Sequence, residues 1–313
     1  MAGPNAEIKI YSDDEALAFL IQHKEILEEL MGKKDLFHFP MPAAMLNEHY
    51  LNYIHQLSSY FYVGVLEEKG ELQAILPLLG ASEMPSPPVN RLEFLAMRPT
   101  VKMEDVKQLF EKMLQIADDL NIPLRFYLFE FTDPKVKELI KELGFQEKGS
   151  LITFMFDLAD PPTPPLKETV KLVSIDDPYA WWSLMLLPYG LPAPLTDKIA
   201  NLFSQREQPV LDVVEKIFHR FLALDANENV VGCIEFWTAT PYPLWINLVV
   251  KPELRGRGLA TSILTAIRDE IKNRNYPKCF ADGESKNTPV LRIFEKLGCQ
   301  AISEEIYFER LRS

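Results

Sequence analysis

The sequence Leu248-Val249-Val250-Lys251-Pro252-Glu253-Leu254-Arg255-Gly256-Arg257-Gly258-Leu259-Ala260 joins an apolar strand to a helix through a proline turn and a glycine-punctuated loop. The helix is predicted because apolar side chains then recur on one helical face, at Ile263, Leu264, Ile267 and Ile271. A strand, a glycine loop and a helix in this order are typical of an anion-binding site.

The loop has the chemistry of a phosphate cradle. Gly256 and Gly258 carry no Cβ, so the backbone can approach a bound anion closely. The first N–H groups of the helix have no partner within the helix, and the helix dipole favours negative charge at that end. Arg255 and Arg257 add guanidinium groups that can form charge-assisted hydrogen bonds with phosphate oxygens.

The loop matches neither of two common nucleotide-binding motifs. It lacks the Gly-Lys-Ser/Thr of a P-loop and the Gly-x-Gly-x-x-Gly of a dinucleotide site. Arg255-Gly256-Arg257-Gly258-Leu259-Ala260 instead resembles the acyl-coenzyme A loop of the GNAT N-acetyltransferase superfamily, whose pattern is Gln/Arg-x-x-Gly-x-Gly/Ala.

A second stretch carries the same resemblance. After a short predicted strand at Lys278-Cys279-Phe280-Ala281, Asn287 precedes a helix that ends with Phe294-Glu295-Lys296-Leu297-Gly298-Cys299. The superfamily pattern at this place is Asn, an amphipathic turn, and then Tyr-x-Lys-x-Gly-aromatic. Two signatures at the proper separation identify the second half of the chain as a member of the superfamily.

The resemblance implies acetyl-coenzyme A as the cosubstrate, and no metal. It places the pyrophosphate at the loop and the pantetheine arm along the backbone of the preceding strand, which splays from its neighbour. The implied contacts are Leu248, Val249, Val250, Arg255, Gly256, Arg257, Gly258, Leu259, Ala260, Thr261 and Asn287. The Thr261 hydroxyl also fits a local cap, and Asn287 also fits a helix cap.

One departure from the superfamily pattern concerns the general acid. Phe294 stands where the superfamily usually has a tyrosine, and phenylalanine has no proton to give. The tyrosines available to replace it are Tyr242, Tyr276 and Tyr307. The remaining interpretations are that the thiolate leaves into solvent, or that catalysis is weak or absent.

Glu235 and Asn247 are the candidate catalytic residues. Both fall on strands expected beside the thioester, where a carboxylate or an amide can act as a base or orient a water molecule. Glu235 alternates with Ile234 and Phe236, however, and the simpler interpretation of this pattern is an outward-facing strand residue.

The chain also contains an internal repeat. Phe94-Leu95-Ala96-Met97-Arg98-Pro99 resembles Ile246-Asn247-Leu248-Val249-Val250-Lys251-Pro252, and Lys141-Glu142-Leu143-Gly144-Phe145 resembles Glu295-Lys296-Leu297-Gly298-Cys299. Both matches are offset by about half the chain, which indicates two tandem copies of one fold. The expected domains are residues 1–158 and 167–313, joined by a Pro-rich linker at 159–166.

The first copy has lost the glycine loop. In a gapless alignment Met103 takes the place of Gly256. Asp105 takes the place of Gly258, with Glu104 before it. Because carboxylates repel a pyrophosphate, the first domain is expected to keep the fold without the cofactor site.

Both halves alternate predicted strands and helices. Tyr60 to Leu66 with Leu72 to Leu79 predicts a hairpin, as does Phe221 to Leu224 with Val230 to Trp237. Apolar positions from Val106 to Leu120 predict a long amphipathic helix. The expected fold class is α/β, with two tandem GNAT-like domains that are each a twisted mixed sheet flanked by helices.

Composition restricts the other classes of function. The 313 residues carry a net charge of −12 without a basic cluster outside the loop, which argues against nucleic acid as a partner. No apolar run reaches membrane-spanning length, and the first residues do not resemble a secretory signal. Three cysteines fit a reducing compartment, and with five histidines they show no metal-ligand spacing. A cytoplasmic protein without a membrane partner is expected, and its oligomeric state stays open.

These observations lead to one expected activity and leave alternatives open. The chain is expected to move an acetyl group from acetyl-coenzyme A directly to a primary amine of a small molecule, with Cys233, Cys279 and Cys299 as inert core thiols. The aromatic segment from Tyr179 to Gly190 either lines the acceptor pocket or packs on the other domain. The alternatives are an acyltransferase similar to mycothiol synthase and a non-catalytic acyl-coenzyme A sensor or assembly module.

Overall fold

The computed structural model describes residues 6–30, 51, 55, 60–80, 90–92, 95–120, 124–128, 134–159, 166–210, 216–238 and 242–310. Most of the expected linker at 159–166 lies outside these ranges. The chain divides into two compact units. Unit 1 contains the described residues of Met1–Leu36, Ile54–Ser150 and Glu304–Ser313, and unit 2 contains those of Phe37–Tyr53 and Leu151–Ser303.

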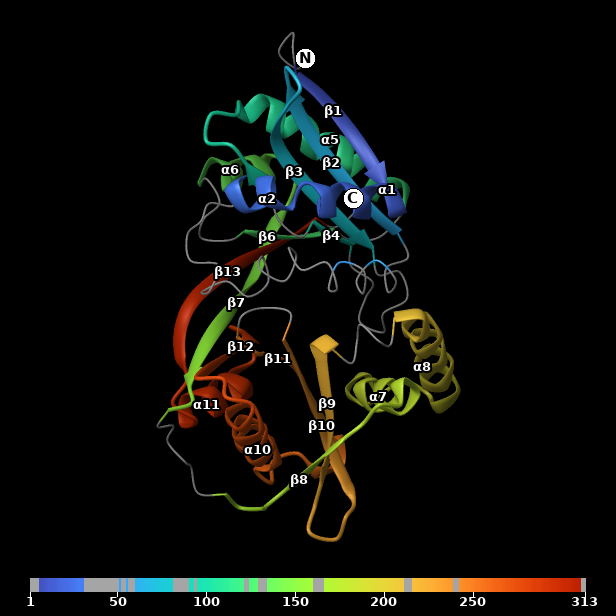
Figure 1. Ribbon diagram of the computed structural model, residues 1–313, viewed down its shortest axis with the longest axis vertical. Coiled ribbons are helices and arrows are strands. Elements are labelled where there is room, and N and C mark those ends of the chain that lie inside the picture. The colour runs from blue at the N-terminus through green and yellow to red at the C-terminus, as the bar shows by residue number, and fades with distance from the viewer. Residues whose placement is uncertain are drawn as a thin grey trace. The chain divides into compact units, whose positions relative to one another are not determined.

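Unit 1 is a mixed sheet with helices on both faces (Figure 1). Its strand order is β1-β2-β3-β4-β6-β13, with β5 beside β3. Only β4 and β6 are parallel among these paired neighbours. The bounds are β1 Ala6–Ser12, α1 Asp13–Gln22, α2 Lys24–Leu30, β2 Tyr60–Glu68, β3 Glu71–Gly80, β4 Asn90–Leu92, β5 Ala96–Met97, α5 Met103–Asp119, β6 Leu124–Leu128, α6 Pro134–Glu142 and β13 Gln300–Arg310.

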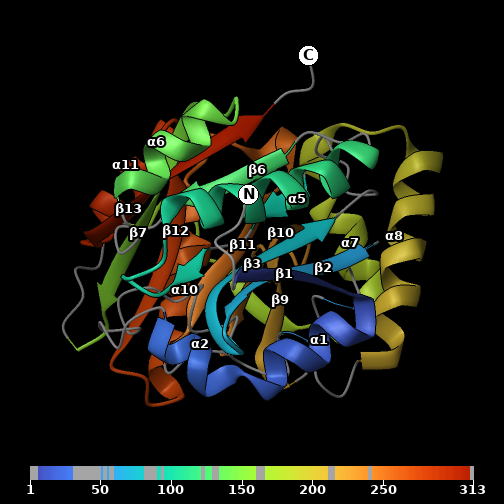
Figure 2. The same cartoon turned by 90° about the horizontal axis from the view of Figure 1, so that it is seen from above.

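The main core of unit 1 lies between α5 and the sheet. The buried face of this amphipathic helix includes Val106, Leu109, Phe110 and Met113. Gly64 of β2 permits the close approach, because a Cβ there would lie 2.7 Å from the sulfur of Met113. Figure 2 shows β1, β2 and β3 between α1 and α2 on one side and α5 and α6 on the other.

Unit 2 has the same kind of mixed sheet. Its strand order is β7-β12-β11-β10-β9-β8, in which only β11 and β12 are parallel neighbours. The bounds are β7 Gln146–Asp157, β8 Lys171–Ser174, α7 Pro178–Met185, η2 Leu187–Tyr189, α8 Ala193–Glu207, η3 Gln208–Val210, β9 Phe218–Leu224, β10 Val230–Trp237, β11 Leu244–Val250, η4 Pro252–Leu254, α10 Leu259–Asn273, β12 Lys278–Glu284 and α11 Thr288–Lys296.

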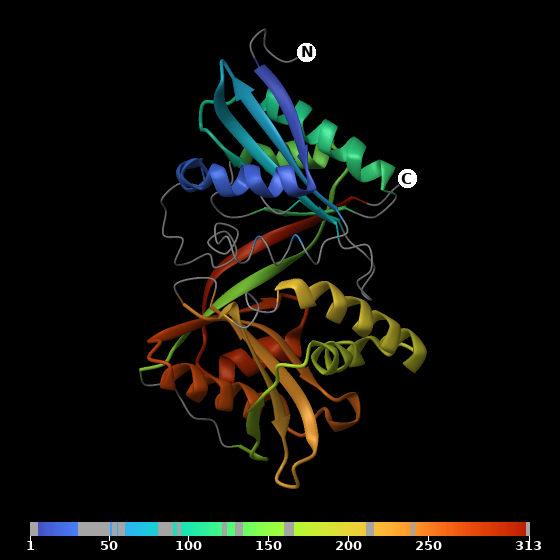
Figure 3. The same ribbon diagram turned by 45° about the vertical axis from the view of Figure 1, so that its right-hand side comes forward.

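Different helices cover the two faces of the unit 2 sheet, as Figure 3 shows. One face packs against α10 and α11 through a core that includes Ile234, Phe236 and Ala281. The other face packs against α7 through Trp181 and Cys233. Because side chains alternate along a strand, every second residue of β10 and β12 belongs to the α7 face.

The last strand of each half of the sequence contributes to the unit formed by the other half. Residues 151–157 of β7 pair with β12 in unit 2. Residues 306–310 of β13 pair with β6 in unit 1. The units therefore differ from the contiguous domains 1–158 and 167–313 expected from sequence. The physical reason is that local periodicity predicts a strand without specifying which sheet edge it joins.

The expected fold class is confirmed, since each unit is a mixed sheet flanked by helices. Both predicted hairpins form, as β2 with β3 and as β9 with β10. The turn of the second hairpin is held by Asp225, whose Oδ1 accepts hydrogen bonds from the N–H groups of Asn227 and Asn229 at 2.9 Å. The predicted long helix of the first half is α5.

Candidate functional site

The parallel strands β11 and β12 part after two residue pairs. Leu244 pairs with Phe280, and Trp245 pairs with Ala281. Beyond that point, residues 247–250 of β11 pair with β10 alone among the described strands. A register shift between β10 and β11 falls at the same place. The edge of β11 that faces away from β10 thus presents backbone groups that β12 does not use.

Backbone conformation requires the two glycines of the loop after β11. Gly256 has a φ of 80°, and Gly258, the N-cap of α10, has a φ of 90°. Other residues rarely adopt this left-handed region. A Cβ at Gly256 would meet nothing within 4 Å, so conformation rather than space requires glycine there. The positive end of the dipole of α10 lies at this loop, with Thr261 half-buried in the first turn.

Three cationic side chains lie at the loop. Arg255 and Arg257 are exposed, and Arg255 Nε donates to the carbonyl of Val250 at 3.3 Å. Lys167, which the sequence analysis missed, runs its side-chain carbons 3.5–3.7 Å from the position of a Cβ on Gly258. No local pattern links Lys167 to a loop so far along the chain. Cations around backbone N–H groups at a helix start form a site suited to a phosphate group.

Asn287 lies exposed at the start of α11. It is the N-cap residue, yet its side chain makes no capping hydrogen bond. Its backbone carbonyl accepts from the N–H groups of Val290 and Leu291 instead, at 3.0 and 3.1 Å. The interpretation of its amide as a helix cap is therefore wrong, and a contact with coenzyme A stays a prediction.

Phe294, the residue in the place of the usual tyrosine, is a core residue. It is 5% exposed, and its ring centroid lies 5.0 Å from that of Phe154 on β7. A Cβ on Gly283 of β12 would lie 3.3 Å from the Phe294 ring, so this ring packs directly under the sheet. Its side chain stabilises unit 2 and has no proton to transfer.

Glu235 is buried rather than outward-facing. It is 2% exposed, because α7 and α8 cover the face of β10 that the alternation had assigned to solvent. Arg220 donates to Glu235 at 2.6 Å and to Glu207 of α8 at 2.6 and 3.0 Å. Asn247 Nδ2 donates to Glu235 at 2.9 Å, and Trp182 Nε1 donates to Glu207 at 3.2 Å.

This network fixes the orientation of Asn247. Burial raises the pKa of Glu235, and the guanidinium of Arg220 opposes that rise. Glu207 is 0% exposed, so solvent reaches neither carboxylate, and both carboxylates pair with Arg220. Glu235 is therefore placed to hold Asn247, the half-buried end of the network beside the parting strands, rather than to receive a proton from a substrate.

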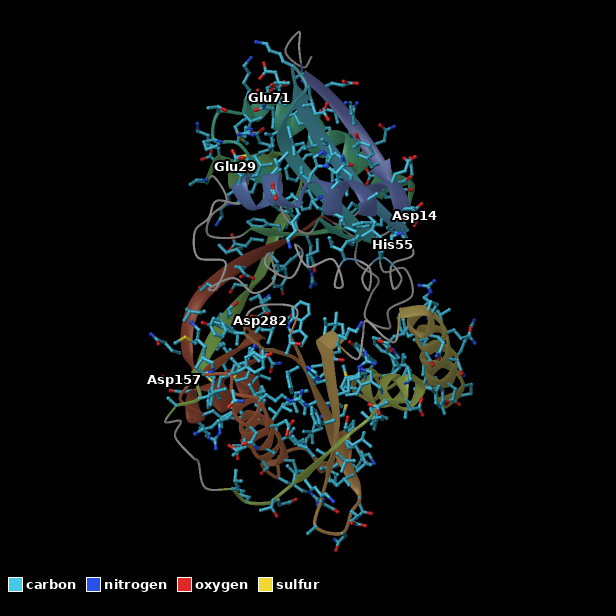
Figure 4. All side chains as sticks on the ribbon, viewed as in Figure 1. Asp14, Glu29, His55, Glu71, Asp157 and Asp282 are labelled. Atoms are coloured by element: carbon cyan, nitrogen blue, oxygen red, sulfur yellow. The ribbon has the colours of Figure 1, made fainter. Side chains whose placement is uncertain are left out.

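Asp282, a carboxylate that the sequence analysis missed, lies on β12 (Figure 4). Cys279 and Ala281 belong to the core under α10 and α11, so alternation places Asp282 on the opposite face of the sheet. Burial raises the pKa of Asp282 to about 6, although a hydrogen bond from Thr153 lowers it. Its Oδ1 is buried and has no hydrogen-bond partner among the residues that the structure describes. The predicted strand ended at Ala281, and one further step of the alternation would have found this residue.

The three tyrosines proposed as general acids lie in different places. Tyr307 belongs to unit 1, where the guanidinium of Arg125 lies 4.6 Å from its ring centroid. Tyr276 packs against the core beside α10. Tyr242 contacts Phe280 of β12, with ring centroids 6.0 Å apart. Because Phe280 shares the strand face of Asp282, Tyr242 is the candidate on that side of the sheet.

The aromatic segment 179–190 packs on its own unit. Trp181 is 1% exposed and contacts Cys233 of β10. The ring of Trp182 lies 4.7 Å from that of Phe203 on α8, centroid to centroid. From the sequence we expected this segment either to line the acceptor pocket or to pack on the other domain. Neither interpretation included packing against α8, because the sequence does not show which helix this segment contacts. Tyr189 remains exposed at the end of the segment.

The three cysteines are poor nucleophiles. Burial raises the pKa of Cys233 and of Cys299 to about 12, and that of Cys279 well above its usual value. Thiols with raised pKa values form little thiolate at neutral pH. Within the described ranges, no helix is both long and apolar enough to cross a membrane. In the same ranges, no group of three His, Cys, Asp or Glu residues is arranged to hold a metal ion.

Residues 188–299 match the acetyltransferase (GNAT) family. Solved structures share the fold over nearly the whole chain. A tandem GNAT protein from the clavulanic acid biosynthesis pathway is 17% identical, with 98% of this chain and 100% of that chain covered and a TM-score of 0.71. Residues 188–299 thus form a GNAT-family domain, and the chain as a whole shares the fold of a solved tandem GNAT protein.

Two further solved structures share the fold over nearly the whole of this chain. A GCN5-related N-acetyltransferase from Sphaerobacter thermophilus is 14% identical, with 99% of this chain and 96% of that chain covered and a TM-score of 0.67. The glucosamine N-acetyltransferase region of a fungal multi-domain beta-N-acetylglucosaminidase is also 14% identical, with 98% and 38% covered and a TM-score of 0.67. At these sequence identities the comparison shows a shared fold alone.

The corresponding helix start of unit 1 lacks the glycine cradle of unit 2. The helix α5 follows a strand in unit 1 as α10 does in unit 2, but its N-cap is Lys102 with a φ of −77°. Glu104 and Asp105 stand in its first turn. The backbone at this helix start therefore has no left-handed glycine, and its carboxylates oppose an anion.

We expect Arg220→Leu to lower the free energy of unfolding by about 3–5 kcal/mol, because it leaves two buried carboxylates without their cation. The matched control is Arg274→Leu, which removes a half-exposed arginine paired with Glu270 at 2.9 Å. The control should lower the same quantity by less than about 1 kcal/mol. Urea unfolding of both variants tests this, and equal losses would show that the buried network contributes no more than a surface pair.

Asp282 should destabilise the protein at neutral and alkaline pH. Its folded-state pKa of about 6 lies above the ordinary value of 3.8, so its contribution is most favourable at low pH and is lost as pH rises through 6. We expect Asp282→Asn to raise the free energy of unfolding near pH 8 by up to about 3 kcal/mol, and to have little effect near pH 4. Urea unfolding at both pH values measures this, and a gain independent of pH would contradict the assignment.

Proposed function

We propose that unit 2 transfers an acyl group, acetyl in the simplest case, from acyl-coenzyme A to a primary amine of a small molecule. The observation that carries the proposal is the parting of β11 and β12 next to a left-handed glycine loop at the start of a 15-residue helix. The match of residues 188–299 to the GNAT acetyltransferase family supports acyl transfer as the class of reaction. The donor and the acceptor are part of the proposal.

The proposed donor site runs from the glycine loop along β11. The backbone N–H groups of Gly256 to Ala260 would hold the pyrophosphate, with Arg255, Arg257 and Lys167 supplying positive charge. The unused edge of Leu248 to Val250 would pair with the amides of the pantetheine arm in the manner of an added strand. Thr261 and Asn287 are proposed as further contacts with the phosphate and the arm.

The acyl group would then lie where the strands part, facing the side of the sheet that carries Asn247. The amine nitrogen attacks the thioester carbon directly, since the high pKa values of the three cysteines argue against an acyl-cysteine intermediate. Asn247, held by Glu235, would orient the carbonyl or the amine through its amide. Tyr242 is proposed as the proton donor to the departing thiolate.

A non-catalytic acyl-coenzyme A sensor is the second candidate, because Phe294 is a core residue without a proton to give. An acyltransferase similar to mycothiol synthase is compatible with one glycine loop in two GNAT copies. Release of free thiol from acetyl-coenzyme A in the presence of a panel of primary amines separates a transferase of either kind from the sensor. Amine-dependent release supports the transferase, and binding without release supports the sensor.

We expect Gly256→Asp to abolish binding of coenzyme A, measured by titration calorimetry. The side chain places a carboxylate at the proposed phosphate site and strains a backbone that has a φ of 80°. Gly70→Asp is the matched control, because Gly70 also has a φ of 80° with nothing within 4 Å of a Cβ, but lies in the turn between β2 and β3.

Both variants should lose similar stability from backbone strain, about 1–2 kcal/mol. Only Gly256→Asp should lose binding. Normal binding by Gly256→Asp would overturn the assignment of the loop, and loss of binding by both variants would attribute the effect to strain.

A further inference from the structure

We propose that Asp282 is the general base of unit 2, which takes a proton from the acceptor amine before the amine attacks the thioester. The inference deepens the acyl transfer proposed above and rests on it. Asp282 belongs to neither of the two superfamily signatures in the sequence. The argument comes from its position, its hydrogen bonds and its isolation from other charges.

Asp282 stands at the point where β11 and β12 part. The last residue pair of the two strands is Trp245 with Ala281, and Asp282 is the next residue of β12. A Cβ on Gly283 would contact α11, so the neighbours of Asp282 in the chain face the helices α10 and α11. Asp282 therefore faces the other side, which is also the side of Asn247. An acyl group held on the unused edge of β11 would have Asn247 and Asp282 on its two flanks.

The carboxylate of Asp282 is only partly satisfied. Thr153, itself 1% exposed, bonds to it from β7, whereas Oδ1 is buried without a hydrogen-bond partner in the described part of the chain. A buried polar atom without a hydrogen bond costs stability, and native proteins rarely retain one. An ammonium group is the ligand that best satisfies such an oxygen, since each of its N–H groups can donate a charge-assisted hydrogen bond. The unpaired Oδ1 of Asp282 therefore favours an amine as the ligand that binds beside it.

Asp282 makes no ion pair with the ionisable groups that the structure describes. The titratable side chains on the same face or beside it are Lys278 and Glu284 on β12, Asp157 on β7, Glu235 on β10, Arg220 on β9, Glu207 on α8 and Tyr242 beside Phe280. Burial and the Thr153 hydrogen bond alone shift its pKa, to about 6. Glu235 and Glu207 share Arg220, whereas no cation of the described ranges pairs with Asp282. A carboxylate with a raised pKa is a stronger base, and it remains ionised at neutral pH.

The proposed step conserves protons and electrons. The Asp282 carboxylate accepts one proton from the ammonium group, which leaves a neutral amine and a carboxylic acid. The amine lone pair forms a bond to the thioester carbon, and the C–S bond then breaks with its electron pair on sulfur. The thiolate is protonated as the nitrogen loses its second proton. Asp282 releases its proton to solvent, so the products are the amide, the thiol and one proton.

Asp282→Asn tests the proposal in the full-length protein. With an amine from the panel that the wild type acetylates, we expect kcat/KM near pH 8 to fall by about 100- to 10,000-fold. Calorimetric affinity for coenzyme A should change by less than about twofold, because the donor site is intact. In the wild type, log kcat/KM should rise with pH and level off above about 6, and the variant should lack that rise.

The matched control is Asp157→Asn, which alters an exposed carboxylate on the same sheet face and should leave turnover unchanged. A merely structural role for Asp282 would lower stability and turnover together, whereas thermal unfolding should show the inactive variant at least as stable as the wild type. An Asp282→Asn protein with normal turnover and the same pH profile overturns the inference and leaves acyl transfer in place. A wild type that binds coenzyme A but acetylates no amine overturns the transferase and the base together.

Discussion

The separation of β11 from β12 is the constraint on which the rest of the site depends. Two parallel residue pairs join the strands, and beyond them β10 is the one described strand that pairs with β11. Unused backbone groups inside a sheet are costly unless a ligand completes them. The glycine loop follows at the end of the same strand, so an extended ligand with an anionic end fits both features at once. Asn247 and Asp282 lie beside this gap, and their proposed roles depend on the separation of the two strands.

One face of the unit 2 sheet contributes mainly to stability, and the other face carries the polar groups of the proposed site. The face under α10 and α11 is an apolar core that includes Phe294. The face under α7 carries a buried arginine with two carboxylates, and also Asp282, whose Oδ1 has no hydrogen-bond partner among the described residues. Apolar residues of similar size would stabilise such positions more, since buried ion pairs rarely exceed their desolvation cost. Charged groups retained at that cost, next to a gap in the sheet, are characteristic of functional sites.

Much of the fold and the glycine loop of the proposed donor site could be predicted from sequence, because both rest on local signals. Hairpins, the long helix α5 and the glycine loop each follow from periodicity or from a short motif. The exchanged strands β7 and β13 could not be predicted, since pairing partners are non-local. Alternation along the strand suggested that Glu235 faces solvent, but it is buried. The alternation shows that a strand has two faces and does not show that helices cover both. Lys167 approaches the loop only through contacts made in space, whereas Asp282 was missed because the predicted strand ended one residue too early.

Hydrogen–deuterium exchange with and without coenzyme A tests the central claim most directly, because it reports backbone N–H groups one segment at a time. The account predicts that coenzyme A slows exchange at residues 248–250 and 256–261, where the strand edge and the start of α10 are expected to bind it. The start of α5, around Glu104, should show no change. Protection at α5, or no protection at the glycine loop under conditions where coenzyme A is bound, would contradict the account.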